Sequence, residues 1–230
     1  MNNETKVKKG DFVEIHYTGK ANGNVFDSNI SEDLKSLDSK AEPKKTIVVI
    51  GENMLVPGLD REIEGKEPGK EYSCVISAKE GFGPRRRELV KTIPLSVFTK
   101  QKINPRPGAS LLMDNHLVRI ITVSGARVIA DFNNPLSGKD LEYKFIIDRI
   151  VDSDSEKAET LFDFFFRTIP EFSIKEKEIL VKLPKEAEPL ISLFSEKFEK
   201  LMGKSLKLEI PQDSSKPENG NKTEDKSNPL

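Results

Sequence analysis

The sequence is poor in the residues that build disulfides and metal centres. A single cysteine, Cys74, excludes an intramolecular disulfide framework and any zinc site made of several thiolates. Two histidines, His16 and His116, leave little material for a metal centre or a histidine-based catalytic triad. Neither histidine has a cysteine or a second histidine at ligand spacing, so we expect both to be hydrogen-bonded or exposed. The sequence predicts no metal and no other cofactor.

Long apolar runs and an excess of basic charge are also missing. No segment approaches the roughly 18 consecutive apolar residues that a membrane helix needs. The N-terminal stretch MNNETKVKKGD lacks the apolar core of a secretory signal. The 37 Lys and Arg residues are balanced by 38 Asp and Glu residues, whereas a protein that coats nucleic acid needs a strongly basic surface. We therefore expect a cytoplasmic protein that binds neither a membrane nor nucleic acid.

Alternating apolar and polar residues predict an antiparallel sheet near the N-terminus. Between Phe12 and Tyr17, the residues Val13, Ile15 and Tyr17 share one face, with Glu14 and His16 on the other. Asn22-Gly23 is a hairpin sequence, so Asn24–Asp27 should return antiparallel to the first strand. The other predicted elements here are a short helix capped by Ser31, a strand at Ile47–Ile50, a helix from Pro57 to Gly65, and a strand at Glu71–Ser77.

The composition changes after the predicted loop Gly81–Pro84. Arg85–Arg87 form a basic patch, for which a solvated loop is the simplest interpretation and contact with phosphate or peptide is the alternative. Ile93-Pro94 predicts a break in the chain, and His116 falls in a predicted turn. Four strands are predicted in this part of the chain, at Ala109–Met113, Leu117–Val123, Ala126–Phe132 and Leu141–Val151.

The remaining residues predict a separate C-terminal module. An acidic linker at Asp152–Glu159 runs into a helix with a phenylalanine cluster, Phe162–Phe166, which is expected in a core. An amphipathic helix follows Pro184. Three further strands are predicted, at Phe172–Ile174, Ile179–Leu183 and Ser205–Ile210. Residues 211–230 are almost free of apolar side chains and cannot offset the entropy of the chain, so we expect them to be disordered.

Two residues or motifs that could carry chemistry have simpler interpretations. Cys74 shares a face with Tyr72 and Ile76, and no nearby basic residue or histidine lowers its pKa, so it is expected to be buried rather than nucleophilic. Gly81–Gly83 lacks the Lys-Ser/Thr ending and the following helix of a phosphate loop. These patterns predict a β-rich protein with an α/β module, and they predict no reaction.

Three segments, in this order, resemble FKBP-type peptidyl-prolyl cis-trans isomerases. The first is Val13–Gly19, followed by Gly23, Phe26, Asp27 and Ser28. The second is Gly51 with Leu55–Asp60, and the third is Pro68–Lys70 leading to Gly81–Gly83. The resemblance implies an α+β fold, in which an antiparallel half-barrel packs against one short helix.

The long interval between Gly83 and the last strand of this part resembles the SlyD-like branch of the family, which has a chaperone domain inserted in the flap. Ile93–Phe98 and Phe132–Lys139 resemble the segments that lead into and out of that domain. The histidine-rich tail of some members is absent, so nickel delivery is not implied. The resemblance implies an isomerase domain at 5–86 and 132–152, an inserted β-rich domain at 87–131, a C-terminal α/β domain at 153–210 and a tail at 211–230.

The resemblance also implies a pocket and a role for each residue in it. Its lining would be Tyr17, Phe26, Asp27, Val48, Leu55, Val56, Leu59, Phe82 and Tyr143. Leu59 stands where many members have Trp, and Phe82 stands where many have Tyr, which changes the pocket floor and removes a ligand-binding hydroxyl. The Val56 N–H would hold a substrate carbonyl, and Asp27 would orient the substrate and Tyr17. The alternatives are a strand-end cap for Asp27 and ordinary sheet core for the aromatic residues.

The inserted domain would bind unfolded, proline-containing polypeptides through an apolar surface. Candidates for that surface are Ile93, Phe98, Leu111 and Met113, and the alternative for each is the insert's own core. The long archaeal members of the family have a C-terminal domain that can mediate dimerisation, which implies a homodimer here. Two other functions remain open at this point: a non-catalytic chaperone with a degenerate pocket, and a protein whose residues 153–210 dock on a ribosome or partner.

Overall fold

A computed structural model describes residues 6–38, 40–113 and 116–210. The described chain forms two compact units, which divide between Asp152 and Ser153. The predicted disordered tail at 211–230 lies outside the described residues, as does the turn at Asp114-Asn115.

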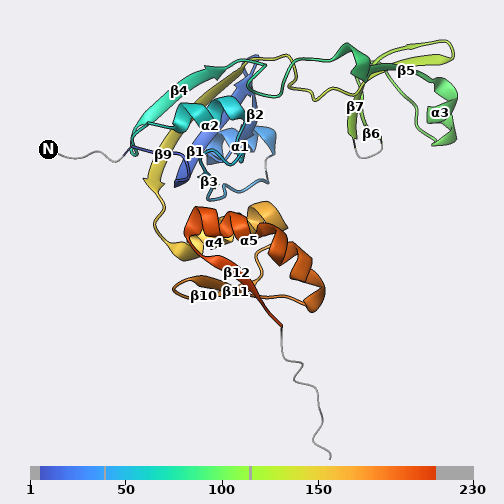
Figure 1. The fold of residues 1–230 in the computed structure, drawn as a ribbon. Helices are drawn as coiled ribbons and strands as arrows, with labels where there is room; N and C mark the ends of the chain where they lie inside the picture. The colour runs from blue at the N-terminus through green and yellow to red at the C-terminus, as the bar shows by residue number, and fades with distance from the viewer. Residues whose placement is uncertain (1–5, 39, 114–115, 211–230) are drawn as a thin grey trace, which may run out of the picture. The chain divides into compact units, whose positions relative to one another are not determined.

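An antiparallel sheet forms the centre of the first unit (Figure 1). Its strand order is β2-β1-β9-β4, and the short strand β3 also pairs with β1. These strands are β1 (Phe12–Ala21), β2 (Asn24–Ser28), β3 (Ile47–Val49), β4 (Glu71–Ile76) and β9 (Leu141–Ile150). Asn22 and Gly23 have φ values of 51° and 76°, which are those of a hairpin turn that matches the twist of its strands. The predicted sheet and hairpin are confirmed.

Two short helices accompany the sheet. In α2 (Pro57–Ile63), Pro57 occupies the first turn, where its missing N–H is tolerated, and Leu59 and Ile63 are buried against the sheet. The second helix, α1 (Ser31–Leu37), begins one residue earlier than predicted. Ser31 is the first helical residue of α1 and not its cap. Ile30 holds the cap position, and the Ile30 N–H donates to the Ser28 hydroxyl oxygen at 3.0 Å.

A second, four-stranded antiparallel sheet lies between β4 and β9 in the sequence. Its order is β5-β8-β7-β6, from β5 (Val90–Pro94), β6 (Ser110–Met113), β7 (His116–Ser124) and β8 (Arg127–Asp131). A 3-10 turn (Arg87–Leu89) precedes β5, and α3 (Leu95–Lys100) follows it. We call these residues, Val90–Asp131, the insert. Its core consists of Phe98 from α3 with Val118, Ile120, Val128 and Ala130 from the sheet.

The predicted chain break at Ile93-Pro94 is wrong. Strand β5 continues through Pro94, which lies opposite Arg127, and α3 begins at the next residue. Proline is tolerated here because β5 is an edge strand and one side of it needs no hydrogen-bond donors. The prediction also missed α3 entirely, and it placed His116 in a turn, whereas His116 begins β7 opposite Met113.

Hydrogen bonds tie together the two segments that connect the insert to the central sheet. The Arg86 N–H donates to the Asn133 side chain at 2.8 Å, and the Asn133 amide donates back to the Arg86 carbonyl at 2.9 Å. The Gly138 N–H donates to the Gly83 carbonyl at 2.8 Å. Arg85 reaches Asp131 with Nε at 3.1 Å and with Nη2 at 2.5 Å. The two connections therefore behave as one braced pair rather than as two independent loops.

The brace depends on the charge of Asp131. Burial alone raises the pKa of this carboxyl, but hydrogen bonds from Asn133 and the Arg85 guanidinium outweigh burial and hold the pKa below its ordinary value. A carboxyl whose pKa is lowered in the folded state stabilises the fold above its unfolded-state pKa, and that stabilisation is lost as the pH falls through the folded value. Because the carboxyl of an unfolded aspartate has a pKa of about 4, the brace should weaken only in solutions more acidic than that.

Removing the Arg85 guanidinium should loosen the connections at neutral pH. In Arg85→Gln we expect the Arg86 and Phe132 amides to exchange with solvent about fivefold faster, which corresponds to about 1 kcal/mol for a partly exposed ion pair. Hydrogen exchange followed by NMR measures this. Arg87→Gln is the control, because Arg87 is exposed and, within the part of the chain that the structure describes, makes no such bond to the opposite segment. Equal exchange rates in the Arg85 variant and the parent chain would contradict the brace.

The second unit packs two helices and three strands. Its elements are α4 (Asp154–Phe166), β10 (Glu171–Ile174), β11 (Glu178–Lys182), a 3-10 turn (Lys185–Ala187), α5 (Glu188–Met202) and β12 (Ser205–Glu209). Strand β11 is central, antiparallel to β10 and parallel to β12. Phe162 of α4 and Phe198 of α5 are fully buried, with ring centroids 5.0 Å apart. Of the phenylalanine cluster predicted to be core, Phe162 is buried, and Phe164, Phe165 and Phe166 are partly buried.

Most of the predicted acidic linker at Asp152–Glu159 belongs to α4 and was wrongly assigned. Ser153 caps the helix by accepting a hydrogen bond from the Glu156 N–H at 3.5 Å. Asp154 and Glu156 lie in the first turn, where negative charge interacts favourably with the helix dipole. The acidic residues therefore start a helix instead of preventing one.

Candidate active site

Four aromatic side chains from four different segments meet over one end of the central sheet. Tyr17 comes from β1, Phe26 from β2, Tyr143 from β9, and Phe82 from the loop after β4. The Phe26 ring meets Tyr143 edge-on at a centroid distance of 5.9 Å and meets Phe82 edge-on at 6.0 Å. Tyr17 and Tyr143 lie 6.4 Å apart. The structure thus brings together all four aromatic residues that the resemblance assigned to the pocket walls.

Gly19 makes this close approach of rings possible. It lies opposite Tyr143 in the β1–β9 pairing and opposite Asp27 in the β1–β2 pairing. A Cβ atom at this position would lie 2.7 Å from Phe26 Cζ and 2.8 Å from Tyr143 Cε1, closer than non-bonded carbons approach. Gly19 belongs to the first family-like segment of the sequence, but its role becomes visible only in the spatial pairing of three strands.

The floor of the site is apolar and is formed by the start of α2. Leu59 is 1% exposed and Val48 is buried beside it in the same core, while Leu55 and Val56 are partly buried. Val56 precedes the first turn of α2, and its carbonyl accepts the Asp60 N–H at 3.1 Å. The Val56 N–H has no acceptor among the residues that the structure describes, as is common at the first turn of a helix. It is therefore available to a ligand.

Asp27 and Tyr17 form a polar pair at the edge of the aromatic cluster. The Tyr17 hydroxyl donates to Asp27 Oδ2 at 2.9 Å, and Asp27 is exposed. Burial raises the pKa of the Tyr17 phenol far above its usual value, and the neighbouring Asp27 charge raises it further. Burial and then Asp27 raise the pKa of Tyr143 in the same direction. Both hydroxyls therefore stay protonated and can act only as neutral hydrogen-bonding groups.

Comparison with known proteins agrees with this geometry. The sequence profile of the FKBP-type peptidyl-prolyl cis-trans isomerases matches residues 3–97, and the profile "FKBP26, IF domain" matches residues 91–136. A SlyD isomerase of Haemophilus influenzae is 32% identical over 143 residues, which cover 60% of this chain and 69% of that protein. The chain belongs to the FKBP-type peptidyl-prolyl cis-trans isomerase family.

Two further relatives carry the same activity in their names. The short-type peptidyl-prolyl cis-trans isomerase of Methanocaldococcus jannaschii is 29% identical over 153 residues, which cover 65% of this chain and 98% of that protein. The SlyD protein of Vibrio cholerae is 33% identical over 98 residues, which cover 40% of this chain and 48% of that protein. Family membership makes this chain a peptidyl-prolyl cis-trans isomerase.

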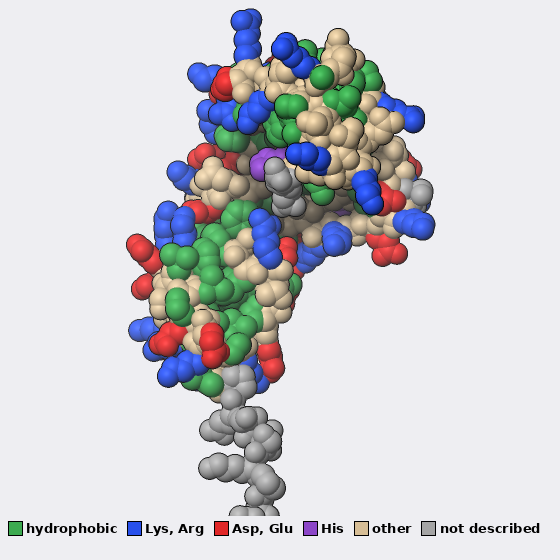
Figure 2. Space-filling view, turned by 90° about the vertical axis from the view of Figure 1, so that its right-hand side faces the viewer, with side chains coloured by type: hydrophobic (Ala, Val, Ile, Leu, Met, Phe, Trp, Pro, Cys, Tyr) green, Lys and Arg blue, Asp and Glu red, His purple; other side chains and the backbone are tan. Residues whose placement is uncertain are grey.

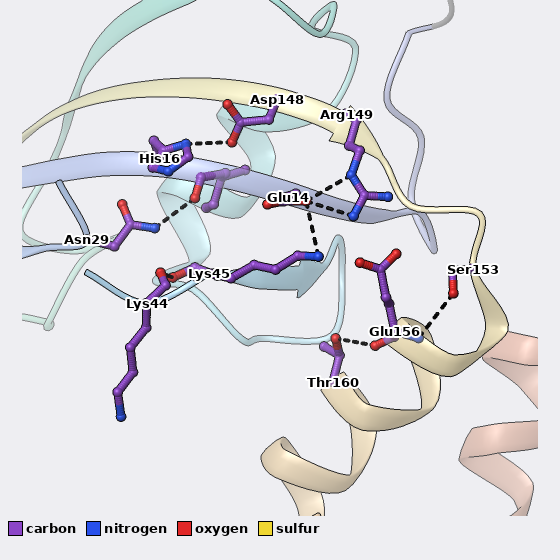
Figure 3. Close-up of polar contacts among 12 residues, drawn as sticks. Glu14, His16, Asn29, Lys44, Lys45, Asp148, Arg149, Ser153, Glu156 and Thr160 are labelled. Carbon is purple, nitrogen blue, oxygen red and sulfur yellow. Dashed lines mark hydrogen bonds and ion pairs between the residues drawn. The ribbon is translucent and has the colours of Figure 1, made fainter. Parts of the chain in front are cut away.

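The outward face of the FKBP sheet carries polar pairs rather than a second site. His16 Nδ1 lies 2.6 Å from Asp148 Oδ2, and Arg149 Nη2 lies 2.8 Å from Glu14 Oε2 (Figure 3). Lys45 approaches the same Glu14 oxygen at 3.6 Å. The pairs His16–Asp148 and Glu14–Arg149 link β1 to β9 across the face opposite Val13 and Ile15, and Lys45 belongs to the segment before β3. Among the described residues no group of three His, Cys, Asp or Glu could hold a metal ion.

Cys74 lies on β4 against the FKBP core, and it should be unreactive. Burial raises the pKa of its thiol to about 11, and the nearby Glu62 adds to the effect. At pH 8 we expect a thiol-specific reagent to label the folded chain at least about 100-fold more slowly than free cysteine, because the thiolate is the nucleophile. Urea-unfolded chain is the control and should label rapidly with one equivalent. Equally fast labelling of folded and unfolded chain would contradict the burial.

The insert places its predicted binding residues differently. Phe98 is fully buried, so its side chain belongs to the insert's core and was wrongly assigned to a binding surface. Ile93, Leu111 and Met113 are partly buried and pack against that core. The exposed apolar side chains of the sheet are Leu112, Leu117, Ile121 and Ile129, of which Leu112 and Leu117 lie opposite each other on β6 and β7. The adjacent apolar pair Leu111-Leu112 could have indicated this exposed surface from the sequence. In a strand with one solvated face, apolar and polar residues should alternate, so one of two adjacent leucines must face solvent.

No helix in the described part of the FKBP chain is both long and apolar enough to span a membrane.

Proposed function

We propose that the aromatic cluster is the isomerase pocket and that the insert holds unfolded client chains beside it. The observation that carries this proposal is the cluster of Tyr17, Phe26, Phe82 and Tyr143, which packs on the same apolar core as Leu59 and Val56. An apolar wall with one hydrogen-bond donor suits a prolyl ring and the carbonyl that precedes it. Asp27 orients the substrate and fixes the Tyr17 hydroxyl.

Such a pocket accelerates isomerisation without a covalent step. Rotation about an X–Pro bond has a barrier of about 20 kcal/mol, because amide resonance is lost as the bond twists. The twisted amide has less charge separation than the planar one, so a dry apolar surface favours it relative to water. The two phenols serve this purpose because they remain neutral, as their raised pKa values indicate.

The insert raises the concentration of client prolines near the pocket. Unfolded chains bind weakly, and a second binding surface in the same protein increases the effective concentration of the bound segment at the first. The exposed side chains Leu112 and Leu117 lie directly opposite each other on β6 and β7 and offer such an apolar surface. The clients are unfolded or partly folded polypeptides that contain proline, and the protein acts on them in the cytoplasm.

Refolding of a protein limited by proline isomerisation tests this proposal. At one molecule of chain per hundred of substrate, we expect faster refolding, and a variant that lacks residues 87–131 should be much less effective on protein substrates. Aggregation of an unfolded client, measured by light scattering with equimolar chain, gives the holdase activity separately. If refolding is unchanged at catalytic amounts while aggregation is suppressed, the pocket is not catalytic and the non-catalytic chaperone function replaces this one.

We also propose that the second unit joins two chains into a homodimer. Figure 2 shows a broad apolar area on one face of this unit. Among the described residues of the unit, Leu193 is 68% exposed, and Ile169 and Leu190 are also exposed. A contiguous apolar patch on a protein surface commonly marks an interaction site. Sedimentation should give a dimer for the parent chain and a monomer for Leu193→Glu, with Leu112→Glu in the insert as the control. A monomeric parent chain would remove this part of the proposal.

A further inference from the structure

A cleft lies between Phe82 of the aromatic cluster and residues of the insert. It has a volume of about 690 Å³, and its apolar lining comes from Phe82, Leu89 and Phe132. Phe82 is shared with the aromatic cluster, where it meets Phe26 edge-on. The cleft therefore adjoins the aromatic cluster through this one shared side chain. Its volume falls in the range of about 300–1,000 Å³ that is usual for ligand sites.

The cleft is positively charged. Its lining includes Arg86 and Lys91, and no described residue of the lining is a carboxylate. The Lys91 ammonium lies over the Phe132 ring, 5.1 Å from its centroid, which holds a cation beside an apolar surface. Arg86 approaches Glu88 at 3.8 Å, but both side chains are exposed, and such an ion pair is weak. Both cations remain accessible to an anionic ligand.

The structure gives the three arginines of the basic patch three different surroundings. Arg85 is committed to Asp131 in the brace between the connecting segments. Arg86 uses its backbone in the same brace and turns its side chain to the cleft. Arg87 is exposed and does not line the cleft. Neither interpretation of the patch in the sequence distinguished these three positions.

We propose that this cleft is an extended subsite of the isomerase, which binds the client chain next to the isomerised proline and favours acidic residues there. The proposal rests on the proposed function of the pocket. Where a polypeptide whose prolyl ring lies among the aromatic residues leaves past Phe82, its extended chain advances about 3.3–3.6 Å per residue. Its next few residues then lie along Phe132 and Lys91. Apolar side chains of the client contact Leu89 and Phe132, and its carboxylates pair with Arg86 and Lys91.

Edge strand β5 adds a backbone surface to the same subsite. Leu89 and Lys91 belong to or directly precede β5, which pairs only with β8 in the described sheet. An edge strand can accept an extended peptide by β-augmentation, in which the main chain gives affinity and side-chain contacts give selectivity. The charge contacts therefore select among client segments that the backbone would otherwise bind alike.

Peptide substrates that differ only beside the proline test the subsite. We would compare twelve-residue peptides with one central Ala-Pro and with Glu, Gln or Lys at the second to fourth residues on both sides. A tetrapeptide without these flanks serves as the reference, and exchange NMR gives kcat/KM for each. We expect the Glu peptide to exceed the Lys peptide by about threefold to tenfold, the range for two exposed charge contacts. The ratio should shrink as salt is added, because the cations are exposed.

Two full-length variants complete the test. In Arg86→Gln/Lys91→Gln the ratio of kcat/KM between the Glu and Lys peptides should fall to about one, and this ratio does not depend on the amount of folded enzyme. Arg87→Gln removes one equal charge outside the cleft and should keep the parent ratio. A parent ratio near one, or an equal loss in both variants, overturns the subsite. Failure of the parent chain to isomerise even the tetrapeptide overturns the proposed function itself.

Discussion

Replacing Phe98 by alanine should unfold the insert and leave the isomerisation of a short peptide intact. Phe98 is fully buried, and it is the only aromatic side chain among the five buried residues of the insert's core. Truncation of a buried Phe destabilises by about 3–5 kcal/mol, and so small a core has little stability to lose. Hydrogen exchange should show loss of protection in β5–β8, and suppression of client aggregation should fall with it.

The neighbouring residue provides the control for this change. Val97 lies on the same helix and is exposed, so Val97→Ala should keep both the protection and the holdase activity. The central sheet has its own core, and its amides should stay protected in both variants because local unfolding follows packing units. Retention of full protection in β5–β8 by Phe98→Ala would show that the insert does not depend on this core.

The second large effect is expected at Gly19. In Gly19→Ala the new methyl group would overlap with Phe26 and Tyr143, so both rings must move and the pocket wall must open. We expect kcat/KM for a proline tetrapeptide to fall at least about tenfold, since a 1 Å displacement of positioning groups can cost about 100-fold. The stability should fall by only about 1–3 kcal/mol, as for other overpacked sites, and thermal unfolding measures this.

Gly23→Ala separates the effect on the pocket from the effect on stability. Gly23 lies in the adjoining hairpin turn with φ of 76°, and a Cβ atom there has open space around it. This variant strains the backbone by about 1 kcal/mol but leaves the rings in place. We expect near-normal kcat/KM for it. If both variants lose activity in proportion to their stability, or if Gly19→Ala is fully active, the rings are not held by the contact inferred here.

The sequence predicted the central sheet well because its elements are determined by local patterns. Period-two alternation located β1, and the dipeptide Asn22-Gly23 located its hairpin, since few other residues adopt two successive positive φ values. Pro57 located the start of α2. The walls of the site, in contrast, came from the family resemblance. Residues as distant in sequence as Tyr17 and Tyr143 carry no local signal of their meeting.

The insert was predicted less well because long-range packing overrides local propensity there. From the sequence alone, Pro94 predicts the end of a strand. Only the edge position of β5 makes a proline acceptable within that strand. Phe98 was a candidate for the binding surface through the family resemblance, and its burial depends on strands that follow it by twenty residues or more. The Arg85–Asp131 pair joins two segments that are distant in the sequence, so no pattern within either segment could indicate it.

The position of β9 has a consequence for how the protein is made. This strand pairs with both β1 and β4 and carries Tyr143, yet it follows the whole insert in the sequence. During synthesis the N-terminal half of the sheet must therefore wait, without its middle strand, until residues 141–150 leave the ribosome. By then the four strands and the helix of the insert have already emerged, and domains generally fold as units in the order of their synthesis. Under the proposed function, each new copy would therefore acquire the client-holding surface of the insert before the pocket that contains Tyr143, and would pass through a stage at which only the holding activity is formed.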